Sequence, residues 1–378
     1  MLEERSPAAP ARPGAGLTLG VEEEFLLVEP LAGTPVPQAG LVLAAAGAHP
    51  AGGHYARELL TSQIEAATGV CGDLAEARRQ IRDARAALAA AARREGLLLL
   101  STGTPVRPGT VPVSDHDARC ETISRIYAGV VADYQSCGCH VHVGVPDRDT
   151  AVAVVNHLRP WLPALLALSA NSPFDRGRDS GHASWRMVEQ SRFPGSGVPP
   201  VFASAADYDR RVDRLVECGV VADPAMSFWL ARLSPHLPTV EVRAADAAAT
   251  AGEAVLQAAI TRGLVGTALR DLAAGREAPP ADPGVCAAAV WNAARYGLEG
   301  PGVDPFEERQ VPVRQLLEAL LEHITPALEE TGDLREVRCL LATVLRVGSG
   351  AERQRRAAAD GAPALIRMLA RQTGGEDR

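Results

Sequence analysis

The stretch Leu17-Thr-Leu-Gly-Val-Glu-Glu-Glu-Phe-Leu-Leu-Val28 gives the first indication of how this chain folds. Its alternating apolar residues predict a β-strand that buries one face. The buried face carries Leu19, Val21, Phe25 and Leu27. Glu22 and Glu24 then project from the opposite face, where two carboxylates one pleat apart repel each other unless they are solvated, protonated or share a cation. An ordinary solvated strand is the alternative for this stretch alone.

A similar pattern follows in Arg57-Glu-Leu-Leu-Thr-Ser-Gln-Ile-Glu-Ala-Ala-Thr68. Its second half predicts a strand with Gln63 and Glu65 on the polar side, and Glu58 lies seven residues before Glu65. The other side carries Ser62, Ile64 and Ala66. A helix end with surface acids is the alternative.

Ser136-Cys-Gly-Cys-His-Val-His-Val-Gly-Val-Pro146 contains the pattern Cys-x-Cys-His-x-His, which suggests a zinc site. Strand geometry argues against zinc, because Cys137 and Cys139 then share the apolar face while His140 and His142 share the other. We therefore expect the cysteines to fill the core. The two histidines lie on the polar face, and a purely structural role for them stays open.

Leu237-Pro-Thr-Val-Glu-Val-Arg-Ala244 repeats the pattern, with Glu241 and Arg243 on the polar side. If these strands share one sheet, its polar face gathers carboxylates, imidazoles and an arginine. That many acids need cations, and oxygen-dominated ligands favour Mg²⁺ or Mn²⁺ over zinc. Such metals commonly serve to bind nucleotide phosphates.

Arginine must supply any anion-binding side chain, because all 38 basic residues are arginine and the chain has no lysine. This excludes Schiff-base chemistry, pyridoxal phosphate anchoring, the Walker A lysine and the kinase lysine. Four arginines, among them Arg186 and Arg192, fall between positions 176 and 192. Guanidinium groups match carboxylates and phosphates, although a solvated arginine-rich loop is the alternative.

The bulk properties are those of an ordinary globular protein of 378 residues, either one large domain or about two to three smaller ones. The net charge of -8 offers no footprint for nucleic acid or anionic membrane. The apolar run 151–170 is interrupted by polar residues and prolines, so we do not expect a membrane span. Seven irregularly spaced cysteines suggest reduced thiols and a cytoplasmic location. Residues 1–16 are expected to form a disordered leader.

Helical periodicity predicts most of the remaining elements. Asp73–Glu95 is expected to be an amphipathic helix and Leu97–Thr102 a buried strand. Further helices are expected at Cys120–Gln135, Asp149–Ser169 with kinks at Pro160 and Pro163, Thr250–Glu277, Ala287–Tyr296, Val313–Glu330, Leu334–Leu345 and Glu352–Gln372.

Five motifs follow one another along the chain: Gly20-Val-Glu-Glu-Glu-Phe25, Cys137-Gly-Cys-His-Val-His-Val-Gly-Val-Pro-Asp147, Leu168-Ser-Ala-Asn-Ser-Pro-Phe174, Gly177-Arg-Asp179 and Pro238-Thr-Val-Glu-Val-Arg243. Together they resemble the carboxylate–amine ligase family, the type 2 glutamate–cysteine ligase-like group. The resemblance covers about residues 17–300, with a weaker echo at Gly348-Ser-Gly-Ala-Glu-Arg-Gln-Arg355. It implies an α+β fold with a glutamine-synthetase-like catalytic domain, in which a curved antiparallel β-sheet forms a half-barrel or funnel with helices packed outside. It also implies a single ligase domain over residues 17–372, sheet-rich in 17–245 and mostly helical in 246–372.

The same resemblance implies an ATP-dependent enzyme that joins a carboxylate to an amine through an acyl phosphate, giving a γ-glutamyl amide where the acid is glutamate. Small-molecule, amino-acid-like acids and amines are the expected partners, and a homodimer is left open. The implied Mg²⁺ or Mn²⁺ ligands are Glu22, Glu24, Glu58, Glu65, His142 and Glu241. The implied catalytic residues are Arg243, Glu24 and Glu241. Arg243 and His140 would contact the nucleotide, and Arg186 and Arg192 would bind a substrate carboxylate.

The chain departs from the family pattern at three places. This chain has Gly103-Thr-Pro-Val-Arg107 where relatives carry Gly-Thr-His-Pro-Phe. It has Trp229-Leu-Ala-Arg232 where relatives have an aromatic residue followed by Asp-Val-Arg. Asp175 takes the place of the usual tryptophan. We expect substrate contacts at Pro105, Asp175 and Leu230, so the acid or the amine can differ from glutamate and cysteine, as in a specialised biosynthetic pathway.

Two rival functions follow from the same residues. His140-x-His142 on a strand suggests a metal-dependent amidohydrolase, but that class expects more histidine ligands and often a carbamylated lysine, and it places the motif on the first barrel strand. A ligase fold retained as a non-catalytic ATP-binding module is the second rival. The complete set of acids favours an enzyme over both.

Overall fold

The computed structural model describes residues 17–113 and 118–375, so the predicted leader lies outside the described residues. Its centre is an open antiparallel sheet in the order β2-β3-β1-β5-β9-β8, with β4 paired to the far end of β1. The strands are β1 (Leu19–Val28), β2 (His54–Arg57), β3 (Gln63–Ala67), β4 (Leu98–Leu100), β5 (Gly138–Gly144), β8 (Ala231–Leu233) and β9 (Thr239–Asp246). All four strands expected from period-two patterns are therefore neighbours in one sheet.

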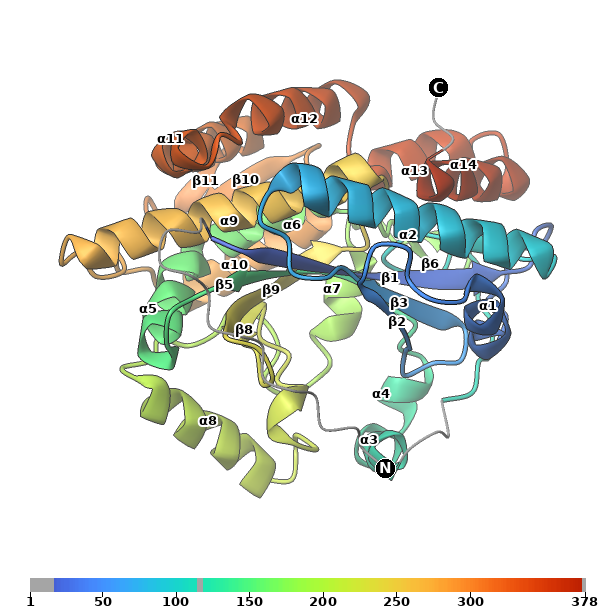
Figure 1. Ribbon diagram of the computed structural model, residues 1–378, viewed down its shortest axis with the longest axis horizontal. Helices are drawn as coiled ribbons and strands as arrows, with labels where there is room; N and C mark the ends of the chain where they lie inside the picture. Colours follow the sequence, from blue (N-terminus) through green and yellow to red (C-terminus); the bar gives the residue numbers. More distant parts are fainter. Residues whose placement is uncertain (1–16, 114–117, 376–378) are drawn as a thin grey trace.

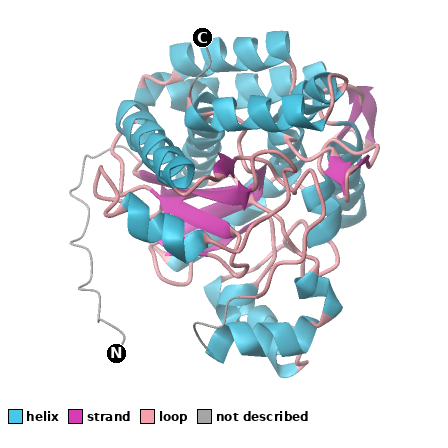
Figure 2. Cartoon of the chain, turned by 90° about the vertical axis from the view of Figure 1, so that its right-hand side faces the viewer, coloured by secondary structure: helices cyan, strands magenta, loops and turns pink. Residues whose placement is uncertain are grey.

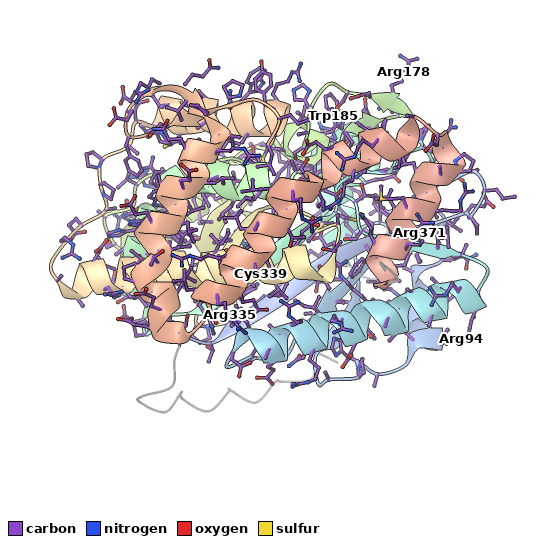
Figure 3. All side chains as sticks on the ribbon, turned by 90° about the horizontal axis from the view of Figure 1, so that it is seen from above. Arg94, Arg178, Trp185, Arg335, Cys339 and Arg371 are labelled. Atoms are coloured by element: carbon purple, nitrogen blue, oxygen red, sulfur yellow. The ribbon has the colours of Figure 1, made fainter. Side chains whose placement is uncertain are left out.

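One face of this sheet is covered by the long helices α2 (Leu74–Arg94) and α9 (Ala251–Ala273), which lie side by side above it in Figure 1. The α2 helix begins at the predicted residue, because Asp73 accepts a hydrogen bond from the Glu76 amide as its N-cap. Seen from above, α11 (Val313–Thr331), α12 (Leu334–Val347), α13 (Gly350–Ala358) and α14 (Ala362–Gly374) form a further layer (Figure 3). The expected α+β fold, an antiparallel sheet with helices packed outside, is confirmed.

The opposite face of the sheet looks towards a smaller helical group, shown below it in Figures 1 and 2. This group comprises α3 (Ala118–Tyr127), α4 (Gly129–Ala132), α8 (Ala205–Glu217) and the 3₁₀ turn η2 (Pro224–Met226). Its core is aromatic, with the rings of Phe193 and Phe228 stacked 4.4 Å apart and Tyr134 set edge-on to Phe193. The acidic face of the sheet therefore has a wall opposite it.

A buried ion pair ties α2 to the sheet at a position where alternation would place an apolar residue. Glu23 points towards the helices with Val21 and Phe25, and Arg85 of α2 meets it with Nε 2.9 Å and Nη2 2.6 Å from the two carboxylate oxygens. Both residues are at most 3% exposed. Arg85 also donates to the Ala248 carbonyl at 2.6 Å. Such a pair is stable only when both charges find partners.

Several predicted boundaries need correction. The expected helix Cys120–Gln135 breaks at Ala128, which has a positive φ of 45°, and the expected helix 352–372 is two helices separated around Gly361. The expected helix 149–169 is a continuous helical run, in which the 3₁₀ turn η1 (Arg159–Trp161), containing Pro160, joins α5 (Arg148–Leu158) to α6 (Leu162–Ser169). Elements without a prediction are α1 (Ala39–Ala46), β2, β6 (Phe174–Asp175), β7 (Arg178–Asp179), α7 (Trp185–Gln190), α8, η2, β8 and the hairpin of β10 (Pro301–Asp304) and β11 (Arg309–Pro312). The helix α10 (Pro283–Tyr296) begins earlier than expected.

The α5–α6 segment, residues 148–169, is long and apolar enough by composition to cross a membrane. In this fold, 83% of its most apolar window is buried. Leu158, Leu162 and Leu165 of this segment belong to the main core cluster with the apolar side chains of β5 and β9.

Candidate active site

The register of the sheet brings the predicted site residues together. Directly opposite residues in an antiparallel pair point to the same face. On this face Glu24 of β1 is opposite Glu65 of β3, and Glu22 is opposite His140 of β5. His142 is opposite Glu241 of β9. Four strands thus contribute one continuous acidic surface.

This surface forms the floor of a cavity of about 450 Å³, which we call the acidic cavity. Residues from both edges of the sheet line it, including Arg57 of β2 and Arg232 of β8. The sheet must therefore curve around the cavity, as expected for a half-barrel. Tyr134 and Phe228 of the aromatic group line the opposite wall.

The carboxylates of Glu24, Glu58 and Glu65 form a first acid group, with one oxygen of each within 4.8 Å of the others. Burial, together with the Glu24 charge, raises the pKa of Glu58 to about 7. Burial and the neighbouring Glu58 carboxylate raise the pKa of Glu65 well above its usual range. Three half-buried carboxylates at this distance need a shared cation, and an all-oxygen set suits Mg²⁺ or Mn²⁺.

Glu22, His142 and Glu241 form a second group, again with ligand atoms within 4.8 Å of one another. Both oxygens of Glu241 already accept from Arg232, at 2.7 and 3.2 Å. Arg243 forms a further ion pair with Glu241. Although burial opposes it, the two arginines hold the pKa of Glu241 well below its usual range. The first acid group therefore has the greater need for a metal, because guanidinium groups partly neutralise the second.

His140 links the two groups. Its Nδ1 lies 3.5 Å from Glu22 Oε2 and 3.3 Å from Arg243 Nη1, and its Nε2 lies 3.8 Å from Glu24 Oε1. Burial and the nearby Arg243 charge lower the pKa of this imidazole. A neutral ring here can accept or donate on either side, which suits a residue that orients its charged neighbours.

Arg186 of α7 lines the acidic cavity, and its guanidinium is buried. Nη2 donates to the Arg243 carbonyl at 3.3 Å and Nη1 lies 3.9 Å from Asp246 Oδ1. Among the described residues, Nε and Nη1 of Arg186 and Nε of Arg243 have no hydrogen-bond partner. Buried, unpaired guanidinium nitrogens facing a cavity are ready to bind an anion.

Asp246 holds Arg186 from behind. This fully buried carboxylate accepts from the Asn171 amide at 2.9 Å and from the Ser172 and Ser184 hydroxyls at 2.7 Å. Gln354 of α13 fixes Asn171 in turn, donating to its carbonyl and side-chain oxygens at 2.8 Å. The C-terminal motif of residues 348–355, which contains Gln354, therefore stabilises the loop around Asn171 that supports Asp246 and Arg186.

The remaining predicted site residues differ in whether the structure places them at the acidic cavity. Glu58, supported in the sequence only by its spacing from Glu65, does join the acid group. Arg192 does not line the acidic cavity, and its Nη2 lies 3.6 Å from Glu189 Oε1. A substrate contact for Arg192 therefore stays a prediction. Leu230 is fully buried in the main core, so the expected substrate contact there is wrong.

The two cysteines do not behave alike. Cys139 packs in the main core as predicted. Cys137 precedes β5, packs in a separate cluster and accepts from Gln63 Nε2 at 3.3 Å, so the prediction that it shares the face of Cys139 is wrong. Both thiols are buried, and burial raises the pKa of each well above its usual range, which suits core residues rather than zinc ligands.

Sequence reasoning missed Arg232 and Tyr134. Arg232 holds Glu241 and also donates to the Ala225 and Ser227 carbonyls at 2.7 Å, closing the β8 edge of the cavity. Its one signal was the alternation in Leu230-Ala-Arg-Leu233, too short to predict a strand. Helical periodicity places Tyr134 inside the expected helix Cys120–Gln135, whereas in the structure it lies after the end of α4, in an irregular segment.

Cation binding at the first acid group leads to a prediction about stability. Millimolar Mg²⁺ should raise the melting temperature of the natural protein, because a ligand that binds only the folded state stabilises it. Glu65→Gln should remove most of this increase while being no less stable than the natural protein in EDTA, since the amide relieves like-charge repulsion. Differential scanning fluorimetry measures both effects.

Glu318→Gln, an exposed change on α11, is the matched control and should keep the full Mg²⁺ response. An unchanged Mg²⁺ response in Glu65→Gln would show that the cation binds elsewhere.

The fold that carries the acidic cavity is similar to that of solved ligases. Glutamate–cysteine ligase from Francisella tularensis, solved in complex with AMP, matches 96% of this chain and 89% of its own with a TM-score of 0.68 at 12% identity. The complex of the ubiquitin-like protein Pup with its ligase PafA matches 95% of this chain and 73% of that chain with a TM-score of 0.57 at 14% identity. At these identities the likeness concerns the fold.

Sequence comparison narrows the class to a family. The profile of glutamate–cysteine ligase family 2 (GCS2) matches residues 18–371. A relative from Saccharopolyspora erythraea, provisionally named glutamate–cysteine ligase 2-2, is 56% identical over 374 residues, 98% of this chain and 95% of its own length. The chain belongs to glutamate–cysteine ligase family 2, as its motifs predict, and is an enzyme of the ligase class.

Proposed function

We propose that this protein is an ATP- and Mg²⁺-dependent ligase that forms an amide between an amino-acid carboxylate and an amine through an acyl phosphate. The observation that carries the proposal is the shared face of the sheet. It presents two groups of metal-ligand side chains, and the first group, Glu22 of the second group, Arg186 and Arg243 all line one cavity. Arg186 and Arg243 each carry a buried guanidinium nitrogen without a hydrogen-bond partner among the described residues. Phosphoryl transfer needs little more than positioning and charge neutralisation.

Each residue set has a distinct role in this proposal. The two acid groups would hold Mg²⁺, which supplies charge neutralisation for the nucleotide phosphates. Arg243, between them, stabilises negative charge on the transferring phosphoryl group, and His140 orients Arg243. Arg186 binds the carboxylate of the acid substrate. In this chain arginine supplies the positive charge that lysine supplies to the phosphates in other nucleotide-binding sites.

The chemistry proceeds in two steps. A carboxylate oxygen attacks the γ-phosphorus, the bond between that phosphorus and the β–γ bridging oxygen breaks, and ADP leaves. The amine nitrogen then attacks the acyl carbon, the bond from that carbon to the phosphate oxygen breaks, and phosphate leaves. The amine proton passes to phosphate or to solvent. No side-chain nucleophile is required.

Glutamate and cysteine are the first substrates to test, because the relatives of the family carry those names. Another acid or amine is the alternative, since Pro105 and Asp175 line a cavity beside the site. Small-molecule partners and a net charge of -8 fit a cytoplasmic metabolic enzyme.

A substrate screen tests the proposal. Purified protein, ATP and Mg²⁺ are incubated with pooled carboxylates and amines, and ADP release and product mass are followed together. We expect ADP formation that requires both an acid and an amine, with a product lighter than their sum by one water. ATP binding without turnover in every pool would favour the non-catalytic module.

A further inference from the structure

A second cavity, of about 390 Å³, lies beside the acidic cavity. Its walls come from the loop 104–110, the segment 133–135, the β6–β7 turn and Glu189 of α7. None of the predicted metal ligands lines it. We call it the side cavity, and the function proposed above gives it no role so far.

A single strand of backbone separates the two cavities. Along the segment 133–136, Asp133 and Gln135 line the side cavity while Tyr134 and Ser136 line the acidic cavity. The Ser136 hydroxyl donates to Glu189 Oε2 at 2.7 Å, which joins the two linings. The two cavities therefore share the segment 133–136 as a common wall.

Gln135 indicates what kind of group binds there. Its side-chain Nε2 donates to the Gly109 carbonyl at 2.6 Å, and this carbonyl partner fixes which end of the amide is nitrogen. Oε1 is then left buried without a hydrogen-bond partner among residues 17–113 and 118–375, although Gln135 is only 8% exposed. A buried acceptor without a donor lowers the stability of the folded protein. A ligand that donates a hydrogen bond to this oxygen would remove that penalty.

The charges of the lining agree with a ligand that carries an ammonium group. Glu189 presents a half-buried carboxylate, with Arg192 3.6 Å away on its outer side. Asp133 and Asp175 are held by Arg176, at 2.9 and 4.0 Å. Arg107 belongs to the same lining and is exposed. The most buried side-chain amide and carboxylate acceptors of this lining are therefore Gln135 Oε1 and the Glu189 carboxylate. Its cations, Arg107 and Arg176, are exposed. This arrangement complements the zwitterion of an α-amino acid.

We propose that the side cavity receives the amine substrate, an α-amino acid, with its ammonium group bound by Gln135 Oε1 and the Glu189 carboxylate and its carboxylate facing Arg107. The inference rests on the proposed ligase function and assigns its second substrate to a place. The amine would reach the activated acid past Ser136.

Specificity follows from the same geometry. Pro105, Arg107 and Asp175 lie where the sequence departs from the family pattern, and all three line the side cavity rather than the acidic one. These departures therefore act on the choice of amine. The acid group and Arg186, which serve the carboxylate and phosphate chemistry, are left intact.

The test compares two nucleophiles: an amino acid that must bind in the side cavity before it reacts, and a small amine that can react without binding there. The probes are L-cysteine, and hydroxylamine as a small nucleophile that traps acyl phosphates directly, each with L-glutamate, ATP and Mg²⁺. Glu189→Gln and Gln135→Leu should each raise the KM for L-cysteine at least about tenfold, because a site built to bind N–H groups loses affinity when its acceptors are removed. Hydroxamate formation should stay within about twofold of the natural rate, since the acidic cavity is unchanged.

Glu318→Gln on α11 is the control for surface charge, and its kinetics with both probes should match the natural protein. An unchanged KM for L-cysteine in both side-cavity variants would overturn the inference. A parallel loss of hydroxamate and amide would also overturn it, because the residues would then serve the acid step. If no acid from the substrate screen gives the natural protein either a hydroxamate or an amide, the proposed function itself fails, and the inference fails with it.

Discussion

Glu24→Gln is expected to lower the rate of amide formation by on the order of 10³-fold, while the protein folds normally. Glu24 belongs to the acid group that most needs a cation, and glutamine removes one charge from it without changing shape. The side chain also accepts from the Gly138 amide at 2.5 Å, and the glutamine oxygen can keep that bond. Steady-state ADP release and thermal unfolding, measured on the same preparation, check both parts.

Glu24 gives a cleaner test than Glu241. Glu241 is 2% exposed and ion-paired with Arg232 and Arg243, so Glu241→Gln should lower the stability of the protein as well as its activity. The control is Glu318→Gln, which should retain full activity. Near-normal turnover in both Glu24→Gln and Glu241→Gln would remove the metal-face account.

Arg85→Ala is expected to lower the free energy of unfolding by about 3–5 kcal/mol, the usual cost of breaking a buried ion pair from one side. The substitution leaves the Glu23 carboxylate buried without its partner and removes a donor from the Ala248 carbonyl. Denaturant unfolding followed by circular dichroism measures the loss.

Arg79→Ala, on the same helix but 61% exposed, is the matched control and should change the stability by less than about 0.5 kcal/mol. The double variant Glu23→Leu with Arg85→Met should recover part of the loss, because it removes both buried charges together. Equal losses in Arg85→Ala and Arg79→Ala would contradict the role assigned to the pair.

The sequence allowed the site residues to be predicted where side-chain alternation is clean. Glu22, His140, His142 and Glu241 each share a strand with buried valine or leucine neighbours, so period two fixes their face. Register could not be predicted, because pairing Glu24 with Glu65 depends on which strands are neighbours. Glu58 lies in a loop and reaches the group only through that pairing.

Residues placed by irregular backbone escaped prediction for a related reason. The expected helix extends to Gln135, but the chain leaves helical geometry at Ala128 and again after Ala132, so Tyr134 and Gln135 lie in irregular backbone. Arg232 lies in a strand of three residues, which is too short for a period to be recognised. Glu23 breaks the alternation of β1 because Arg85, 62 positions away, neutralises it. The break at Gly361 depends on its positive φ of 91°, which composition alone does not reveal.

Transfer of labelled oxygen tests the central claim most directly. The acid substrate carries ¹⁸O in the carboxylate that is ligated, and the phosphate released during amide formation is analysed by mass spectrometry. An acyl phosphate intermediate predicts one ¹⁸O atom transferred to phosphate for each amide formed. Amide formation with unlabelled phosphate, or with the label in AMP, would contradict the account.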